Sequence, residues 1–256
     1  MKETAASTAR PGKGAQAAIA LAWIGIVLAL ACGASELLAG LGYRWDWWHF
    51  RTGIKILRWS ATADLAAVAL TLAGVILAIS FDARRALGLC SLGLVLSLVV
   101  VGPPLYYGRL LEQLPRIHDI STDTEHPPHY VAVLPMRRGA ENSTDYSAEV
   151  AVQQKRAYPD IAPARFDVPP AQALQRAERA ARDMGWNIVA VAPADLRIEA
   201  TDTTLLFGFK DDVVIRVTPE GSGSRVDVRS VSRVGKSDFG VNARRIRKFM
   251  QQLAAS

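Results

Sequence analysis

The stretch Asp227-Val-Arg-Ser-Val-Ser-Arg-Val-Gly-Lys-Ser-Asp-Phe-Gly-Val-Asn-Ala-Arg-Arg-Ile-Arg-Lys-Phe249 decides the fold of the second half of this chain. Apolar and polar residues alternate up to Ser232, which predicts a strand with one buried face. Gly235-Lys-Ser-Asp238 then breaks the strand, and Ser237 or Asp238 can cap a following helix. Apolar residues next recur at helical spacing. The stretch therefore predicts a strand, a tight polar turn and a basic amphipathic helix.

The segments before this stretch follow the same alternating rule. Residues 196–201 and 213–218 place apolar and polar side chains on opposite faces, and Pro219-Glu-Gly-Ser-Gly223 is a strong hairpin signal. Residues 186–191 form an earlier strand, and a helix opened by Pro169-Pro170 precedes it. The resulting order, β-α-β-β-β-β-α, predicts an antiparallel sheet of four to five strands. Two helices on one face of the sheet would complete an α+β two-layer sandwich.

The first half of the chain differs in composition. Hydrophobic residues make up 50% of the sequence and are concentrated before residue 108. Three apolar runs, residues 17–35, 60–81 and 86–107, are each long enough to cross a hydrocarbon core of about 30 Å as a helix. We therefore expect three N-terminal transmembrane α-helices.

These patterns divide the chain into three parts. We expect a membrane domain at 1–108, an extended linker at 109–164 that packs on the following domain, and a soluble α+β domain at 165–256. Within the linker, residues 131–134 have the composition of a short strand and 148–157 that of a helix.

The flanks of the apolar runs bear on orientation. Basic residues divide almost equally between the two sides: Lys2, Arg10, Lys13, Arg84 and Arg85 on one, and Arg44, Arg51, Lys55, Arg58 and Arg109 on the other. The loop Tyr43-Arg-Trp-Asp-Trp-Trp-His-Phe50 is rich in Trp, which prefers the headgroup layer. We expect the N-terminus inside and the C-terminal domain outside. Glu36 and Asp64 fall near span ends, where snorkelling or packing against a neighbouring span is the expected role.

One set of cations is a candidate binding site for an anion or a lipid headgroup. It comprises Arg229, Arg233, Lys236 and Arg245. They lie close in sequence to a helix start, where free amides and the helix dipole favour an anion. The structural alternative is a set of salt bridges with acids of the same domain: Asp211, Asp212 and Asp227.

A different class of function remains open, a hydrolase or metal-dependent enzyme that uses the His118–His129 region with Asp211 and Asp212. His126-Pro-Pro-His129 lacks the spacing of the zinc metalloproteases. No nucleophile, glycine-rich phosphate loop or oxyanion motif accompanies the two acids. We therefore assign no catalytic residue, no metal ligand and no cofactor, and we expect a binding protein rather than an enzyme.

Several runs occur in an order that resembles a bacterial family known as domain of unknown function 1499. They are Ile117-His-Asp-Ile-Ser-Thr-Asp-Thr124, Tyr158-Pro-Asp160, Arg197-Ile-Glu-Ala-Thr-Asp-Thr203, Phe207-Gly-Phe-Lys-Asp-Asp-Val-Val-Ile-Arg-Val217 and the opening stretch. The resemblance covers residues 115–254 and implies a membrane-attached or exported protein. It also implies that residues 117–163 pack on the domain, and it implies no catalytic residue, cofactor or substrate.

Together these features predict a membrane-anchored protein of the bacterial cell envelope. We expect a multi-pass protein of the inner (cytoplasmic) membrane, with a periplasmic domain that binds a partner protein or an amphipathic or anionic ligand. The net charge of +6 suits either nucleic acid or anionic lipid. The membrane spans favour lipid, and nucleic acid is not an expected partner.

Overall fold

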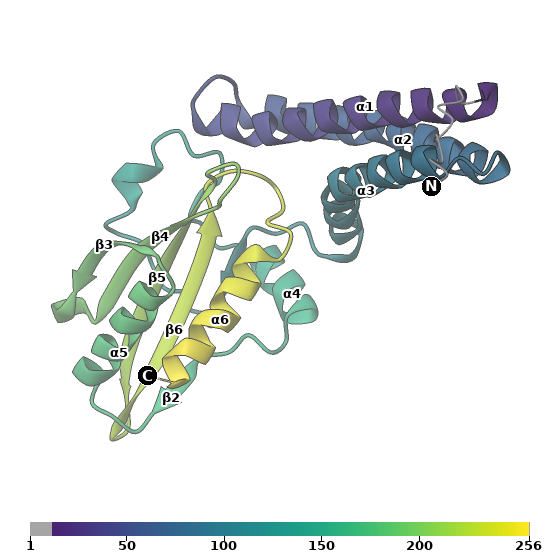
Figure 1. Ribbon diagram of the computed structural model, residues 1–256. Helices are drawn as coiled ribbons and strands as arrows, with labels where there is room; N and C mark the ends of the chain where they lie inside the picture. Colours follow the sequence, from purple (N-terminus) through teal and green to yellow (C-terminus); the bar gives the residue numbers. More distant parts are fainter. Residues whose placement is uncertain (1–11, 256) are drawn as a thin grey trace, which may run out of the picture. The chain divides into compact units, whose positions relative to one another are not determined.

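The structure, a computed structural model, describes residues 12–255 (Figure 1). It divides into two compact units, Met1–Gly108 and Arg109–Ser256. The first unit holds long apolar helices, and the second holds a sheet with shorter helices. Lys2 and Arg10, which enter the count of basic flanks, lie outside the described residues.

The three predicted transmembrane helices are present as three helices long and apolar enough to span a membrane. They are α1 (Lys13–Arg44), α2 (Phe50–Ser80) and α3 (Arg84–Gln113). Large apolar side chains point outward, such as Val27 and Ile79, whereas many of the buried positions carry Ala or Gly. An apolar exterior around small packed residues is typical of helices that face lipid.

Small residues let these helices approach closely. A methyl group added at Gly25 would collide with the side chain of Thr71, and one added at Gly74 would meet the sulfur of Cys90. The thiol of Cys90 lies 3.4 Å from the backbone carbonyl of Ala18, to which it can donate. The first unit is therefore held by close backbone packing between helices, as membrane helices commonly are.

A polar cluster lies among these apolar helices. Asp64 is fully buried, and neither of its carboxylate oxygens has a hydrogen-bond partner among residues 12–255. Within the same residues, one carboxylate oxygen of Glu36 and the hydroxyl of Ser97 are also buried without a partner. Of the two expected roles, packing against a neighbouring span describes Asp64, whose side chain is buried among the packed helices.

The second unit is built on a six-stranded antiparallel sheet. Its strands are β1 (Asp119–Ser121), β2 (Ala164–Phe166), β3 (Asn187–Ala192), β4 (Arg197–Thr203), β5 (Lys210–Glu220) and β6 (Gly223–Ser232). The strand order is β1-β6-β5-β4-β3, and β2 pairs with the first part of β6. The helical segments are η1 (Leu134–Arg137), α4 (Ala148–Ala157), α5 (Pro170–Asp183), η2 (Pro193–Asp195) and α6 (Val241–Ala255).

The antiparallel α+β fold is confirmed, with one strand more than the sequence predicted. The additional strand, β1, comes from the segment that we expected to be an extended linker. It pairs with the end of β6, where Ile120 lies opposite Ser230. A strand of three residues carries too little alternation to be recognised in a sequence, because its pairing partner is more than 100 residues away.

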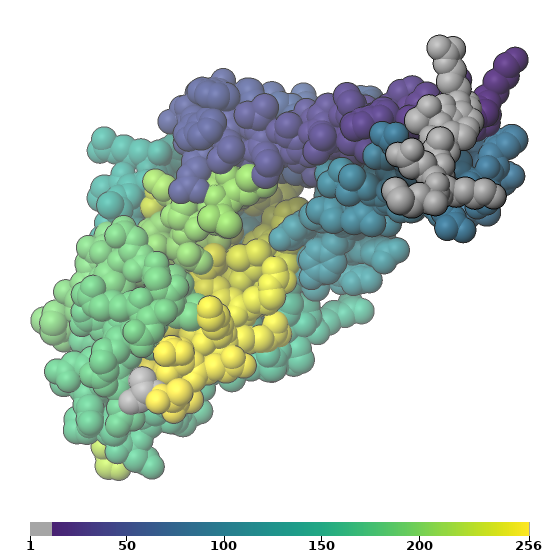
Figure 2. Space-filling view, viewed as in Figure 1, coloured from purple at the N-terminus to yellow at the C-terminus, as the bar shows by residue number. Residues whose placement is uncertain are grey.

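Helices α5 and α6 lie side by side on one face of the sheet, as predicted (Figure 1). Figure 2 shows this face turned to the viewer, with α6 in yellow. Asp238 caps α6 by accepting from the backbone amides of Gly240 and Asn242, each at 2.8 Å. Trp186 stacks on Phe249 beneath the helices, with ring centroids 5.2 Å apart. This helix face is the main apolar core.

The second face of the sheet is covered by residues 122–146, so the two-layer description is incomplete. Tyr130 and Val133 from this segment pack against Val214 and Val231 of the sheet. The predicted strand at 131–134 is wrong, because these residues lead into the 3-10 turn η1. The sequence did not reveal the cover, because the polar residues on this face resemble those of a solvated sheet surface.

The buried carboxylate of Asp64 makes a first prediction. Asp64→Asn keeps the side-chain shape and removes the ionisable group, and no described hydrogen bond is lost. Because an unpaired buried carboxylate is costly, we expect the unfolding temperature in detergent to equal or exceed that of the unchanged protein. Asp64→Ala, which leaves a cavity, is the control and should lower it. A marked fall for Asp64→Asn alone would show that the carboxylate has a charged partner.

Candidate functional site

The most densely charged part of the molecule lies between the second face of the sheet and residues 122–146. We call it the charge layer. Its members are Asp119, Asp123, Arg137, Glu199, Asp212, Arg216, Arg225, Asp227, Arg229 and Arg233. Strands β4, β5 and β6 project their members of this set to one side, because residues two apart on a strand share a face. Asp119 comes from β1, and Asp123 and Arg137 come from the covering segment. The register aligns them, with Thr201 opposite Asp212 and Arg216 opposite Asp227.

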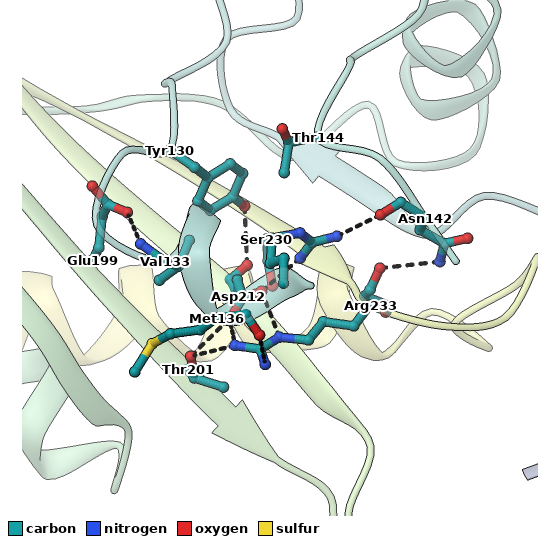
Figure 3. Close-up of polar contacts among 12 residues, drawn as sticks. Tyr130, Val133, Met136, Asn142, Thr144, Glu199, Thr201, Asp212, Ser230 and Arg233 are labelled. Atoms are coloured by element: carbon teal, nitrogen blue, oxygen red, sulfur yellow. Dashed lines mark hydrogen bonds and ion pairs between the residues drawn. The ribbon is translucent and has the colours of Figure 1, made fainter. Parts of the chain in front are cut away.

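Asp212 on β5 is an acid of the charge layer that accepts hydrogen bonds from several parts of the chain (Figure 3). Its buried carboxylate accepts from Arg137 at 2.5 Å, from Thr201 at 2.7 Å, and from two nitrogens of Arg233 at 2.8 and 2.9 Å. The hydroxyl of Tyr130 also donates to the backbone carbonyl of Asp212 at 2.9 Å. One residue thus joins β4, β5, β6 and the covering segment.

Arg229 on β6 is a second buried anchor. It makes a bidentate pair with Asp119, at 2.7 and 3.0 Å, and its guanidinium lies between the rings of Tyr130 and Tyr146, 5.2 and 5.3 Å from their centroids. Its other hydrogen bonds reach backbone carbonyls of the covering segment, those of Pro128 and Thr144. Removing one partner of such a buried pair typically costs about 3–5 kcal/mol, so Arg229 fixes the covering segment to β1 and β6.

Glu199 on β4 holds the start of η1. Its fully buried carboxylate accepts from the backbone amides of Val131, Ala132 and Val133, each at 3.0 Å, and from Arg197 at 2.9 Å. Converging amides of this kind form a ready site for an anion. Here the domain's own glutamate fills that site.

The remaining acids of the charge layer share two arginines. Asp123 and Asp227 each accept from Arg216 and Arg225, at 2.9–3.1 Å, and the hydroxyl of Thr122 donates to Asp227 at 3.1 Å. This cluster closes the far end of the charge layer. Asp227 therefore pairs with Arg216 and Arg225. Among residues 12–255 it does not pair with the candidate anion-binding cations, which is the pairing that the salt-bridge alternative expected.

The structure places three of the four predicted ligand-binding cations in internal ion pairs. Arg229 and Arg233 belong to the charge layer. Arg245 lies on the helix face, where it donates to Asp211 at 2.6 Å. Lys236 is exposed and makes no ion pair within residues 12–255. The four side chains are thus divided between the two faces of the sheet and the surface.

The residues considered for a hydrolase or metal site are also separated. Asp211 and Asp212 point to opposite faces of β5, and each is paired with arginine. His126 and His129 are exposed in the segment that covers the second face, so the sheet lies between them and Asp211. Within residues 12–255, no three His, Cys, Asp or Glu side chains are grouped closely enough to hold a metal.

The electrostatics of the charge layer favour a structural role for its buried carboxylates over a role in proton transfer. Burial alone would raise the pKa of Asp212, but the hydrogen bonds from Arg233 and Thr201 outweigh it and hold this pKa below its usual value. Burial raises the pKa of Asp119, against the opposing effect of Arg229. A carboxylate that is permanently ionised and enclosed by donors cannot act as a general acid at neutral pH.

Sequence reasoning missed Arg137 and Glu199, two of the residues that organise this layer. The available signal was the charge pattern of the strands. Arg197, Glu199, Asp212 and Arg233 carry opposite charges on positions that adjacent strands bring to one face. Such a pattern is favourable on a solvated sheet as well, so it does not distinguish a covered face from an exposed one.

The lowered pKa of Asp212 predicts a dependence of stability on pH. The usual pKa of Asp is about 3.9. Because the folded value is lower, ionised Asp212 stabilises the fold above that pH, and the contribution is lost as the pH falls through the folded pKa. Asp212→Asn should therefore lower the unfolding temperature at neutral pH and reduce its further decline in acid. Asp123, whose pKa is also lowered by hydrogen bonds and nearby arginines after the opposing effect of burial, leaves some decline.

The measurement is the unfolding temperature of the full chain in detergent as a function of pH, with Asp160→Asn as the control. Asp160 pairs with Arg247 on the surface, where an ion pair contributes little. An acid decline that is as steep in Asp212→Asn as in the unchanged protein would contradict the assignment.

Comparison with known proteins agrees with the order of the motifs. Residues 119–253 match the model of a family described as "Protein of unknown function (DUF1499)". No curated protein is similar enough to count as a relative. The matched region begins at β1 and ends within α6, so it includes the segment that covers the sheet as well as the sheet itself. The chain belongs to the DUF1499 family.

Proposed function

We propose that this protein is a membrane-anchored protein of the bacterial cell envelope whose α+β domain binds a partner protein and is not an enzyme. The observation that supports this role is the η1 turn in the covering segment. Val131 shortly before the turn and Leu134 and Met136 within it are exposed by 51%, 45% and 54%. Large apolar side chains grouped on one short segment are typical of a contact surface.

Buried charges hold this turn in place. Glu199 binds the amides of residues 131–133, and Arg137 pairs with Asp212. Arg233 also donates to the backbone carbonyl of Met136 at 2.8 Å. Two fully buried carboxylates, those of Glu199 and Asp212, thus bind this segment. Its exposed side chains are therefore held on a rigid support.

Rigid presentation supports a binding role. A loop that is already ordered loses little conformational entropy when a partner binds, so more of the contact energy appears as affinity. Apolar side chains fixed in water on a rigid scaffold have no benefit for folding, and binding residues commonly lie on loops of this kind. The buried charge layer supplies the support, and the side chains of Leu134 and Met136 supply the contact.

The predicted anion site takes a smaller part in this proposal. Lys236 is exposed and can meet an acidic group of the partner. Arg229, Arg233 and Arg245 contribute by holding the fold around it. A single exposed cation contributes more to the rate and specificity of association than to affinity.

We also propose that the protein is a multi-pass protein of the inner membrane with its domain on the periplasmic side. The three spans support insertion in the membrane. Because the basic flanks are nearly balanced, the support for this orientation comes from the Trp-rich loop after α1. Alkaline phosphatase fused after residue 256 should therefore be active in cells. Green fluorescent protein fused at the same place should be dark, because it does not fluoresce after export by the general route. The reverse pair of results would place the domain in the cytoplasm.

The binding role makes a prediction for the η1 turn. A photo-reactive residue at position 136 of the full chain should form one cross-linked protein adduct of defined mass in native membranes. The matched control is position 152 on α4, where Val152 is exposed by 69% outside the turn. Leu134→Ser should reduce the adduct about tenfold, the loss expected for about 1.4 kcal/mol of binding energy, without changing the unfolding temperature.

Three results would contradict this prediction. An equal adduct at position 152 would show that the contact is not specific to the turn. An adduct that Leu134→Ser leaves unchanged would show that apolar contact does not drive it. Cross-linking to phospholipid alone would show that the turn meets a membrane surface in place of a protein.

A further inference from the structure

A groove in the first unit lies between the early part of α1 and the start of α3. Its volume is about 520 Å³, and its lining residues are Ile19, Trp23, Arg84, Arg85, Gly88 and Leu89. A groove of this size holds more than an inorganic anion. Its composition is uneven, because two guanidinium groups lie on a lining that is otherwise apolar.

The helices give the groove a direction. Ile19 and Trp23 are four residues apart on α1, and Arg85 and Leu89 are four residues apart on α3, so each pair lies on one helix face. Arg84 and Arg85 are the first residues of α3, directly after the turn that joins it to α2. The cations therefore lie at the end of an apolar span, and the apolar walls run from them along the helices.

Both arginines are available to a ligand. They are exposed, and within residues 12–255 neither makes an ion pair. They also begin a helix of 30 residues, whose N-terminal end carries a partial positive charge that adds to theirs. Within residues 12–255, no ion pair thus compensates the positive charge at this end of the groove.

Gly88 keeps the groove open between the two helices. A methyl group added at this position would meet nothing within 4 Å, and the backbone there is ordinary helix. The wall on the other side is Trp23, which is exposed by 54%. The groove is therefore bounded by an indole ring on one helix and by a bare backbone on the other.

We propose that this groove binds one anionic phospholipid. The phosphate is held by Arg84 and Arg85, and an acyl chain lies along Ile19, Trp23 and Leu89, across Gly88. A basic pocket between membrane helices is a recognised form of site for anionic headgroups. Charge complementarity selects the anionic lipid, since a zwitterionic headgroup would bring its own cation to the two arginines. The proposal is independent of the binding role of the soluble domain.

The test uses the full chain purified in mild detergent and mixed with phosphatidylglycerol or with phosphatidylcholine of the same acyl chains. Retained lipid is counted by native mass spectrometry. We expect one retained phosphatidylglycerol, at occupancy about tenfold above phosphatidylcholine, a difference of about 1.4 kcal/mol. Arg84→Gln with Arg85→Gln should remove this preference.

Two further variants separate the groove from general attraction of lipid to positive charge. Lys55→Gln with Arg58→Gln removes two exposed cations from α2 outside the groove and should leave the bound phosphatidylglycerol in place. Gly88→Leu places a side chain in the groove, where its Cβ would meet nothing within 4 Å, and should expel the lipid while both arginines remain. Unfolding temperatures of all variants show that the helices are intact.

Each contrary result would overturn the proposal. Equal retention of the two lipids would show that charge does not select the occupant. Equal loss in the α2 double variant would show that net charge, and not the groove, attracts the lipid. Retention in Gly88→Leu would show that no acyl chain lies in the groove.

Discussion

The carboxylate of Asp212 is the contact on which the arrangement of the soluble domain depends. A buried charge is costly unless donors surround it. The donors to Asp212 come from three other parts of the chain: Thr201 on β4, Arg233 directly after β6 and Arg137 in the covering segment. None of these donors is supplied by a neighbour in sequence. The sheet and its cover therefore stabilise each other, because Arg137 would lose its buried acid without the sheet, and Asp212 would lose one of its donors without the cover.

This constraint also determines which residues remain available for function. Arginines that compensate buried acids cannot also bind an external anion. The contact that we propose for a partner therefore uses the exposed side chains of Leu134, Met136 and Lys236. In the helical unit the situation is reversed. Arg84 and Arg85 have no acid to compensate within the described residues, and Asp64 has no described donor.

Periodicity predicted the elements well where they are long. The hairpin of β5 and β6, the two helices on one face and the cap at Asp238 all follow from local rules, because their residues contact neighbours in sequence or in the next strand. The candidate site was harder to predict. Arg229, Arg233 and Arg245 look alike in the sequence, yet they face different sides of the sheet with different partners. Arg137 carries no local signal, because its partner Asp212 is 75 residues away. Glu199 shows only the charge pattern of the strands, because the amides that it binds are 66–68 residues away.

By itself, the sequence determined three apolar helices and an antiparallel α+β domain, since hydrophobic periodicity and turn chemistry are local properties of the chain. Only the tertiary structure decided whether the polar face of the strand that ends at Ser232 is covered or exposed to water. Its alternating polar side chains could face water or a cover, and the same pattern serves both. Residues 122–146 close over them because β1 returns this segment to the edge of β6, which brings Asp119, Tyr130 and Arg137 onto the polar face. Long-range pairing, which no local pattern records, turned a polar surface into a second, charged core.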